Sequence, residues 1–155
     1  MASTYVKQCQ QIIREYRLAG RSWPAKKVEI AEWALSHEKW EVPREGKLRM
    51  CADDLGEAMR AEYLTDDTGR RVRAKHPAKL KRDEEIGTFW DDIRTAPADF
   101  MRVSVAQRRN GIVAECRQVS NDVRYFNSLH PDVAPIQFVL DFTNDVRELD
   151  ELRAA

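Results

Sequence analysis

EYLTDDTGRRVRAK, residues 62–75, predicts a β-hairpin and therefore a fold that is not purely helical. EYLT and RRVRAK are expected to be the two strands, and the intervening DDTG consists of residues that favour turns. Gly69 ends the turn, where a glycine adopts a positive φ at little cost. A further strand, GTFWDDI, is expected at residues 87–93.

Positive charge is concentrated on this hairpin and on the residues that follow it. The chain has 26 basic and 26 acidic residues, yet no acidic residue interrupts the run from Arg70 to Arg82. Alternation along the second strand places Arg71 and Arg73 on one face, with Val72 and Ala74 packed inward on the other. The seven basic residues of the run are Arg70, Arg71, Arg73, Lys75, Lys79, Lys81 and Arg82.

Three helices are expected before the hairpin. The first covers residues 3–18, with Ser3 in position to act as its N-cap. Pro24 opens a second helix that continues to about residue 37. KWEVP, residues 39–43, is expected to form a short strand, and a third helix covers residues 47–62. Its apolar stripe is formed by Leu48, Cys51, Leu55 and Met59.

A long helix is expected from Pro97 to about residue 127. A heptad-like apolar seam runs along it, interrupted by Arg109, and we favour a continuous helix over a break at Asn110-Gly111. The seam residues are Ala98, Met101, Val105, Ile112, Cys116, Val119, Val123 and Phe126. Since the seam needs an apolar partner, it indicates either a homodimer through residues 97–127 or a monomeric helical hairpin in which Arg109 lies at the edge and extends its stem over apolar surface. Pro135 opens a last amphipathic helix over residues 135–152, or IQFVLDF forms a strand instead.

These elements predict an α-rich α+β protein. Residues 1–94 form a helical domain with a basic β-hairpin, and residues 95–155 form a long helical hairpin that either stands apart or packs with the first domain.

The order of elements expected over residues 24–82 is helix, short strand, helix and basic hairpin, and this order resembles a winged helix-turn-helix domain. The resemblance implies that Arg70, Arg71 and Arg73 contact the nucleic-acid backbone as a wing. It also implies contacts in the major groove from the preceding helix, through Arg49 and Arg60. That helix face carries Asp53 and Glu57 as well, which oppose phosphate, so the hairpin is the stronger candidate.

No pattern of an enzyme or of a cofactor site is found in the sequence. Phosphate-binding glycine loops and nucleophile motifs are absent, and the scattered histidines and cysteines lack the spacing of a zinc site. Asp91-Asp92 is the one carboxylate pair worth testing as a metal site. We therefore expect no catalytic residues, no metal site and no cofactor.

The cysteines and tryptophans are expected to be structural. Cys9, Cys51 and Cys116 are predicted to be buried free thiols, which suits a cytoplasmic protein, as does the lack of a membrane-spanning or signal segment. Trp33 and Trp90 are expected in the core.

The function predicted from these features is a non-catalytic nucleic-acid-binding or regulatory protein that contacts phosphates through the basic run. The alternative is an adaptor that uses the hairpin and the long helix to bind an acidic protein. The acidic C-terminal segment of the chain is a further available partner for the basic run. The remaining interpretation is that the basic side chains are simply solvated and bind no partner.

Overall fold

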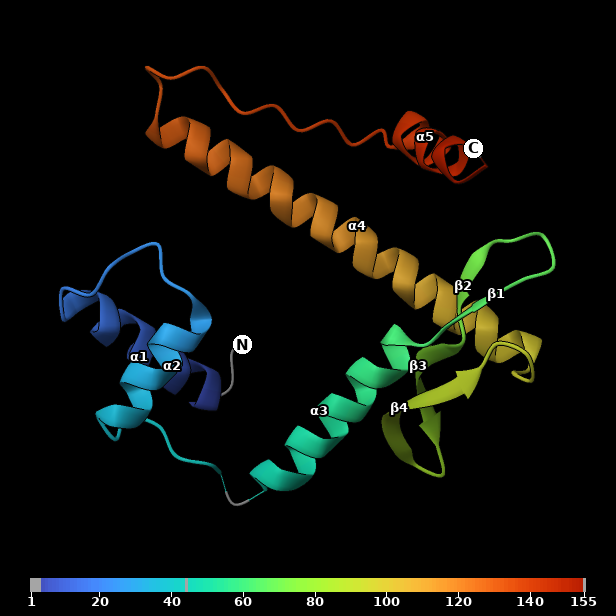
Figure 1. Cartoon of the computed structure of the whole chain (residues 1–155), viewed down its shortest axis with the longest axis horizontal. Helices are drawn as coiled ribbons and strands as arrows, with labels where there is room; N and C mark the ends of the chain where they lie inside the picture. The colour runs from blue at the N-terminus through green and yellow to red at the C-terminus, as the bar shows by residue number, and fades with distance from the viewer. Residues whose placement is uncertain (1–3, 44, 155) are drawn as a thin grey trace. The chain divides into compact units, whose positions relative to one another are not determined.

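The protein is an α-rich α+β chain of two compact units, Met1–Gly56 and Glu57–Ala155 (Figure 1). The computed structural model describes residues 4–43 and 45–154, so the predicted N-cap at Ser3 lies outside the described residues. Within them, the chain forms five helices and two antiparallel hairpins. The predicted boundary between residues 94 and 95 falls inside the second unit. None of the described helices combines the length and the apolarity needed to cross a membrane.

In the first unit, helices α1 (Thr4–Leu18) and α2 (Lys27–Ser36) pack around two aromatic side chains. The buried rings of Tyr16 and Trp33 meet edge to face, with centroids 5.6 Å apart. The helix predicted at residues 3–18 is thus confirmed over the described residues. The predicted start of the second helix at Pro24 is wrong. The Glu29 carboxylate accepts the backbone N–H of Lys26 at 2.8 Å and so caps a helix that begins at Lys27.

Residues 39–43 form no strand, contrary to the prediction. Their hydrogen-bonding groups bind helices instead: the backbone N–H of Lys39 donates to the carbonyl of Ala34, and the Trp40 indole donates to the Tyr5 hydroxyl at 2.9 Å. Helix α3 (Gly46–Ala61) follows, close to the predicted 47–62. Its predicted apolar stripe is largely exposed, with Leu48 79 % accessible.

Two hairpins lie in the second unit, where only one was predicted. Strands β1 (Tyr63–Thr65) and β2 (Arg71–Arg73) form the expected first hairpin. Strand β4 (Glu85–Asp92) overlaps the strand predicted at residues 87–93. Its partner is β3 (Lys75–Arg82), so the second half of the basic run is itself a strand. Ala74 joins the hairpins, because its N–H donates to Glu62 and its carbonyl accepts from Ile93.

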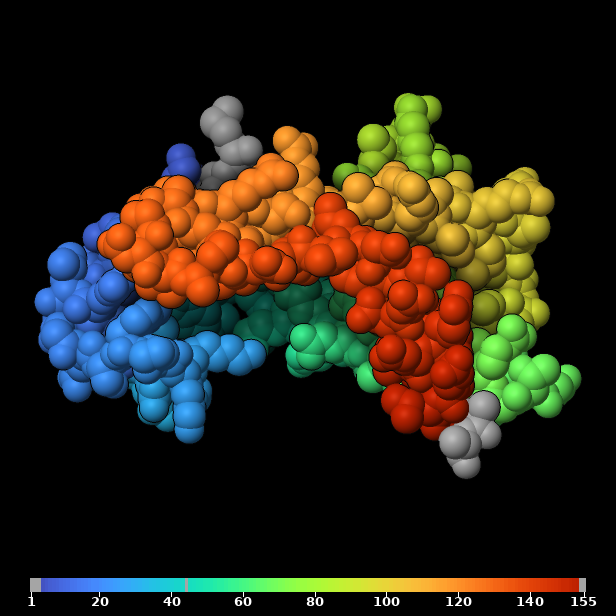
Figure 2. Space-filling view, turned by 90° about the horizontal axis from the view of Figure 1, so that it is seen from above, coloured from blue at the N-terminus to red at the C-terminus, as the bar shows by residue number. Residues whose placement is uncertain are grey.

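Helix α4 (Ala98–Leu129) is continuous through Asn110-Gly111, as predicted. Strand β3 packs across its first half, where the Ser104 hydroxyl donates to the carbonyl of Pro77 at 2.7 Å and Ala78 is 1 % exposed. Between residues 130 and 142 the chain turns and runs back along α4, lining a shared groove with it (Figures 1 and 2).

The last helix, α5 (Thr143–Ala154), begins later than predicted. The Asn127 amide binds both the N–H and the carbonyl of Ile136, which holds this part of the chain extended rather than helical. The Asp141 carboxylate then accepts the N–H of Thr143 at 3.1 Å at the helix start. The alternative strand over IQFVLDF is not formed either, since no strand pairs with it in the described part of the chain.

The three cysteines are free, but the prediction that they are buried is wrong. Cys51 is exposed, and Cys9 and Cys116 are half-buried. The reason is that neighbouring elements cover only part of the apolar faces of the helices that carry these cysteines. Trp33 is buried as predicted, at 8 % exposed, whereas Trp90 is only half-buried.

Candidate nucleic-acid interface

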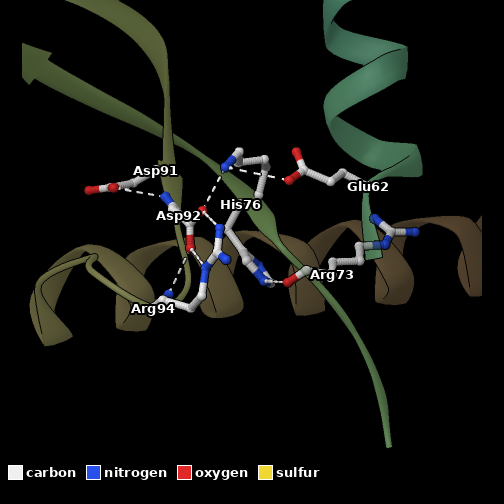
Figure 3. A network of polar contacts seen from close by, with 7 residues as sticks. Glu62, Arg73, His76, Asp91, Asp92 and Arg94 are labelled. Carbon is white, nitrogen blue, oxygen red and sulfur yellow. Dashed lines mark hydrogen bonds and ion pairs between the residues drawn. The ribbon is translucent and has the colours of Figure 1, made fainter. Parts of the chain in front are cut away.

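An ion-pair network joins the start of β3 to the end of β4 (Figure 3). The Lys75 ammonium lies 2.6 Å from Asp92 Oδ2 and 3.7 Å from Glu62 Oε1. Arg94 donates hydrogen bonds to the Asp92 carboxylate from two side-chain nitrogens and from its backbone N–H. The hydrogen bonds from Arg94 first, and then that from Lys75, hold the pKa of Asp92 well below its usual range. Both oxygens of Asp92 are therefore bound by cations, which disfavours the Asp91-Asp92 pair as a metal site.

His76 is fixed on the same strand by a bond to the backbone. Its Nε2 lies 3.0 Å from the carbonyl oxygen of Arg73, and its side chain is buried at 8 % exposed (Figure 3). A carbonyl only accepts, so Nε2 is the nitrogen that donates in this contact. The ring thus links β3 back to the end of β2.

A basic cleft of about 330 Å³ lies beside this network. Five of the residues that line it are lysine or arginine, and none is acidic. They come from the end of α3, from β2 and β3, and from α4. The lining is Arg60, Arg73, Lys75, His76, Pro77, Lys79, Thr88, Ser104, Gln107 and Arg108.

The Gln107 side chain joins α4 to β3, because it binds the backbone of β3 as a neighbouring strand would. The Gln107 amide oxygen accepts the backbone N–H of Lys79 at 2.8 Å, and its nitrogen donates to the Lys79 carbonyl at 2.9 Å. The hydroxyl of Ser104, one turn earlier on α4, binds the carbonyl of Pro77. Both polar side chains are thereby committed to the backbone, which fixes the register of β3 on α4.

Most of the cations in the cleft have no acidic partner. In the described residues, Lys75 forms ion pairs, whereas no carboxylate lies within ion-pair distance of the other four. The Arg60 guanidinium instead lies over the Trp90 ring, 5.3 Å from its centroid. The four unpaired cations are Arg60, Arg73, Lys79 and Arg108.

Tyr63, on β1, lies in the positive electrostatic field next to the cleft. Arg71 stacks over its ring at 3.8 Å from the centroid. A hydrogen bond and the charge of Arg73, followed by the charges of Arg71 and Arg108, lower the pKa of the Tyr63 phenol. Three arginines from β2 and α4 therefore act on one hydroxyl.

The structure separates the predicted site residues into groups. Arg73, Lys75 and Lys79 meet in the cleft, together with Arg60 from the predicted helix contacts. Outside it, Arg70 binds Asp66 at 2.7 Å, and Arg71 covers Tyr63.

The remaining predicted residues do not reach the cleft. At the tip of the second hairpin, Lys81 binds Glu84 at 2.9 Å, and Arg82 lies 3.9 Å from Asp83. Arg49 belongs to the first unit, where its guanidinium lies 5.0 Å from the centre of the Tyr5 ring.

Arg108 and Gln107 are among the lining residues that the sequence alone did not identify. With Ser104 they recur at spacings of three and four, which places three polar side chains on one face of α4. That polar face, next to the apolar seam, was the available signal. It points to a sheet packed on the helix only once β3 is known to be a strand.

Comparison of the chain with protein-family models, with curated proteins and with solved structures finds no match.

Proposed function

We propose that the protein is a non-catalytic nucleic-acid-binding protein that contacts phosphates through the basic cleft and the first hairpin. The observation that carries the proposal is the cleft itself: four cations without acidic partners in the described residues, and no carboxylate in the lining. Lysine and arginine supply most phosphate contacts, and each neutralised phosphate releases counterions. The hairpin of β1 and β2 would lie along the backbone in the manner of a wing, with Arg71 and Arg73 facing it.

Binding to arbitrary DNA and RNA over a salt series tests this function. Affinity measured by filter binding or fluorescence anisotropy should fall steeply with salt and depend little on sequence. Replacing Arg73 and Lys79 with glutamine should weaken binding about tenfold at low salt, by loss of two phosphate contacts.

Lys81→Gln with Arg82→Gln is the matched control for that double variant. It removes the same charge, but both side chains lie near carboxylates in the structure. It should weaken binding clearly less than the cleft variant. A parent protein that binds no nucleic acid at low salt would exclude this function and favour an acidic protein as the partner.

A further inference from the structure

The cleft has more positive charge than an internal phosphate of a strand requires. Four cations are unpaired in the described residues, and Lys75 is the one that is neutralised by carboxylates. A phosphodiester has a single negative charge, whereas a phosphate monoester has about −1.5 to −2 at pH 7. Charge complementarity therefore favours the monoester.

The shape of the cleft favours the same group. Its walls come from α3, β2, β3, β4 and α4, and its volume of about 330 Å³ is at the lower limit for a ligand pocket. A space of that size admits one phosphoryl group with its sugar but not a duplex. A strand end can enter it, because the end is free of one neighbour.

The cations stand on a fixed frame. Gln107 ties α4 to both backbone groups of Lys79, and Arg108 is the next residue on that helix. The Asp92 network holds the start of β3 against the end of β4, next to Arg73 and Lys75. Arg60 is positioned by Trp90 of β4. A backbone frame held in this way does not need to rearrange on binding, which favours affinity.

We propose that the cleft binds a phosphate monoester, with Arg60, Lys79 and Arg108 as the donors to its phosphoryl oxygens. The inference rests on the proposed function in that the monoester is the phosphorylated end of a nucleic-acid strand. A free mononucleotide carries the same chemical group, so the experiment has an arm for each source.

The first arm compares single-stranded oligonucleotides of one sequence with a 5′-phosphate, a 3′-phosphate or hydroxyl ends, by fluorescence anisotropy. At least one phosphorylated end should bind about tenfold more tightly than the hydroxyl form, which corresponds to the gain from one further charge-assisted contact. Arg108→Gln should abolish this preference. Arg109→Gln, which removes the same charge from a neighbouring exposed side chain outside the cleft lining, should preserve it.

The second arm titrates uridine 5′-monophosphate and uridine into the protein by calorimetry. If the monophosphate binds and uridine does not, and if this binding is lost in Arg108→Gln but kept in Arg109→Gln, the monoester site is supported. Should no oligonucleotide bind in that case, only the proposed function fails. Oligonucleotides that bind with a steep salt dependence but without preference for any phosphorylated end overturn the inference and leave the proposed function standing. Equal effects of the two variants in both arms also overturn it.

Discussion

At the residue scale, the carboxylate of Asp92 accepts hydrogen bonds from two basic residues of the second unit. It binds Lys75 and Arg94, and these contacts lower its pKa in the folded state, with the hydrogen bonds from Arg94 as the largest cause. The network lies directly beside the basic cleft and fixes the strand that carries two of its five cations, Lys75 and Lys79. Its loss should therefore affect both stability and phosphate contact.

We expect Asp92→Asn to lower the thermal unfolding temperature at neutral pH. An acid whose folded pKa is depressed contributes stability that is present above its unfolded pKa, about 3.9, and is lost as the pH falls towards the folded pKa. The difference in unfolding temperature between parent and variant should thus be constant from pH 7 to about pH 5 and shrink below about pH 4. Scanning calorimetry across pH measures it.

Asp91→Asn is the control for this variant. Asp91 is the adjacent carboxylate, and its side chain accepts one hydrogen bond, from the backbone N–H of Asp92. Its amide retains an acceptor, so the change should be small at every pH. An equal loss in both variants would show that the ion pairs of Asp92 contribute nothing beyond that local bond.

At the element scale, two glycines allow opposite predictions. Gly111 lies within α4, and a Cβ added there meets no atom within 4 Å. Gly111→Ala should therefore raise the free energy of unfolding by about 1 kcal/mol, the difference in helix propensity. Gly69 has φ +83° in the turn of the first hairpin, so Gly69→Ala should lower it by about 1 kcal/mol.

Chemical denaturation of both variants measures these changes, with circular dichroism at helical wavelengths. If Gly111→Ala is destabilising instead, another chain occupies the space beside that position, since none of the described residues does. That result would bear on self-association at the same helix.

The helices were predicted better than the strands, for a physical reason. Spacings of three and four are local, so α1, α3 and α4 followed from residues such as Leu48, Cys51 and Leu55 or Met101 and Val105. Strand β3 was missed because Lys75–Arg82 has four basic residues and Pro77, and neither favours a strand. Packing of Ala78 and Ser104 against α4 stabilises the strand despite its composition.

The cleft was predictable only in part for the same reason. The charge run indicated Arg73, Lys75 and Lys79, which lie close together in the chain. Arg108 joins them through a contact between β3 and α4 that depends on Gln107, far along the sequence. A local pattern has no information on such a contact.

At the scale of the whole molecule, the apolar face of α4 needs a further partner. Val105 and Ile112 are each 57 % exposed, and Phe126 is 44 % exposed. We propose a homodimer that buries this face, which is one of the two arrangements that the seam indicates. Light scattering at tens of micromolar should give about twice the 18.0 kDa of one chain.

Val119→Asp should dissociate that dimer, because it places a charge on the seam. Asn121→Asp adds the same charge on the opposite face of the helix and should leave the dimer intact. A parent mass of one chain at every concentration would contradict the dimer.

The acidic end of the chain is expected to weaken nucleic-acid binding. Residues 143–155 have four acidic and two basic side chains, a net charge of −2 in a chain with net charge 0. Leu149 and Leu152 are 58 % and 76 % exposed, so a chain ending at Phe142 should remain folded by circular dichroism. It should bind DNA more tightly at low salt and equally at high salt, because salt screens the repulsion. Weaker binding by the folded truncation would show that α5 supports the interface.

The amide of Gln107 also has a consequence for the solubility of the chain. A two-stranded hairpin leaves the outer edge of each strand unpaired, and such an edge can recruit a strand from another molecule. At Lys79 both outward backbone groups are already bound by a helix side chain that imitates a peptide unit. The charged side chain of Lys79 repels a like strand along the same edge. Gln107 and Lys79, which line the cleft, therefore also protect β3 from the edge-to-edge aggregation that its unpaired edge would otherwise permit.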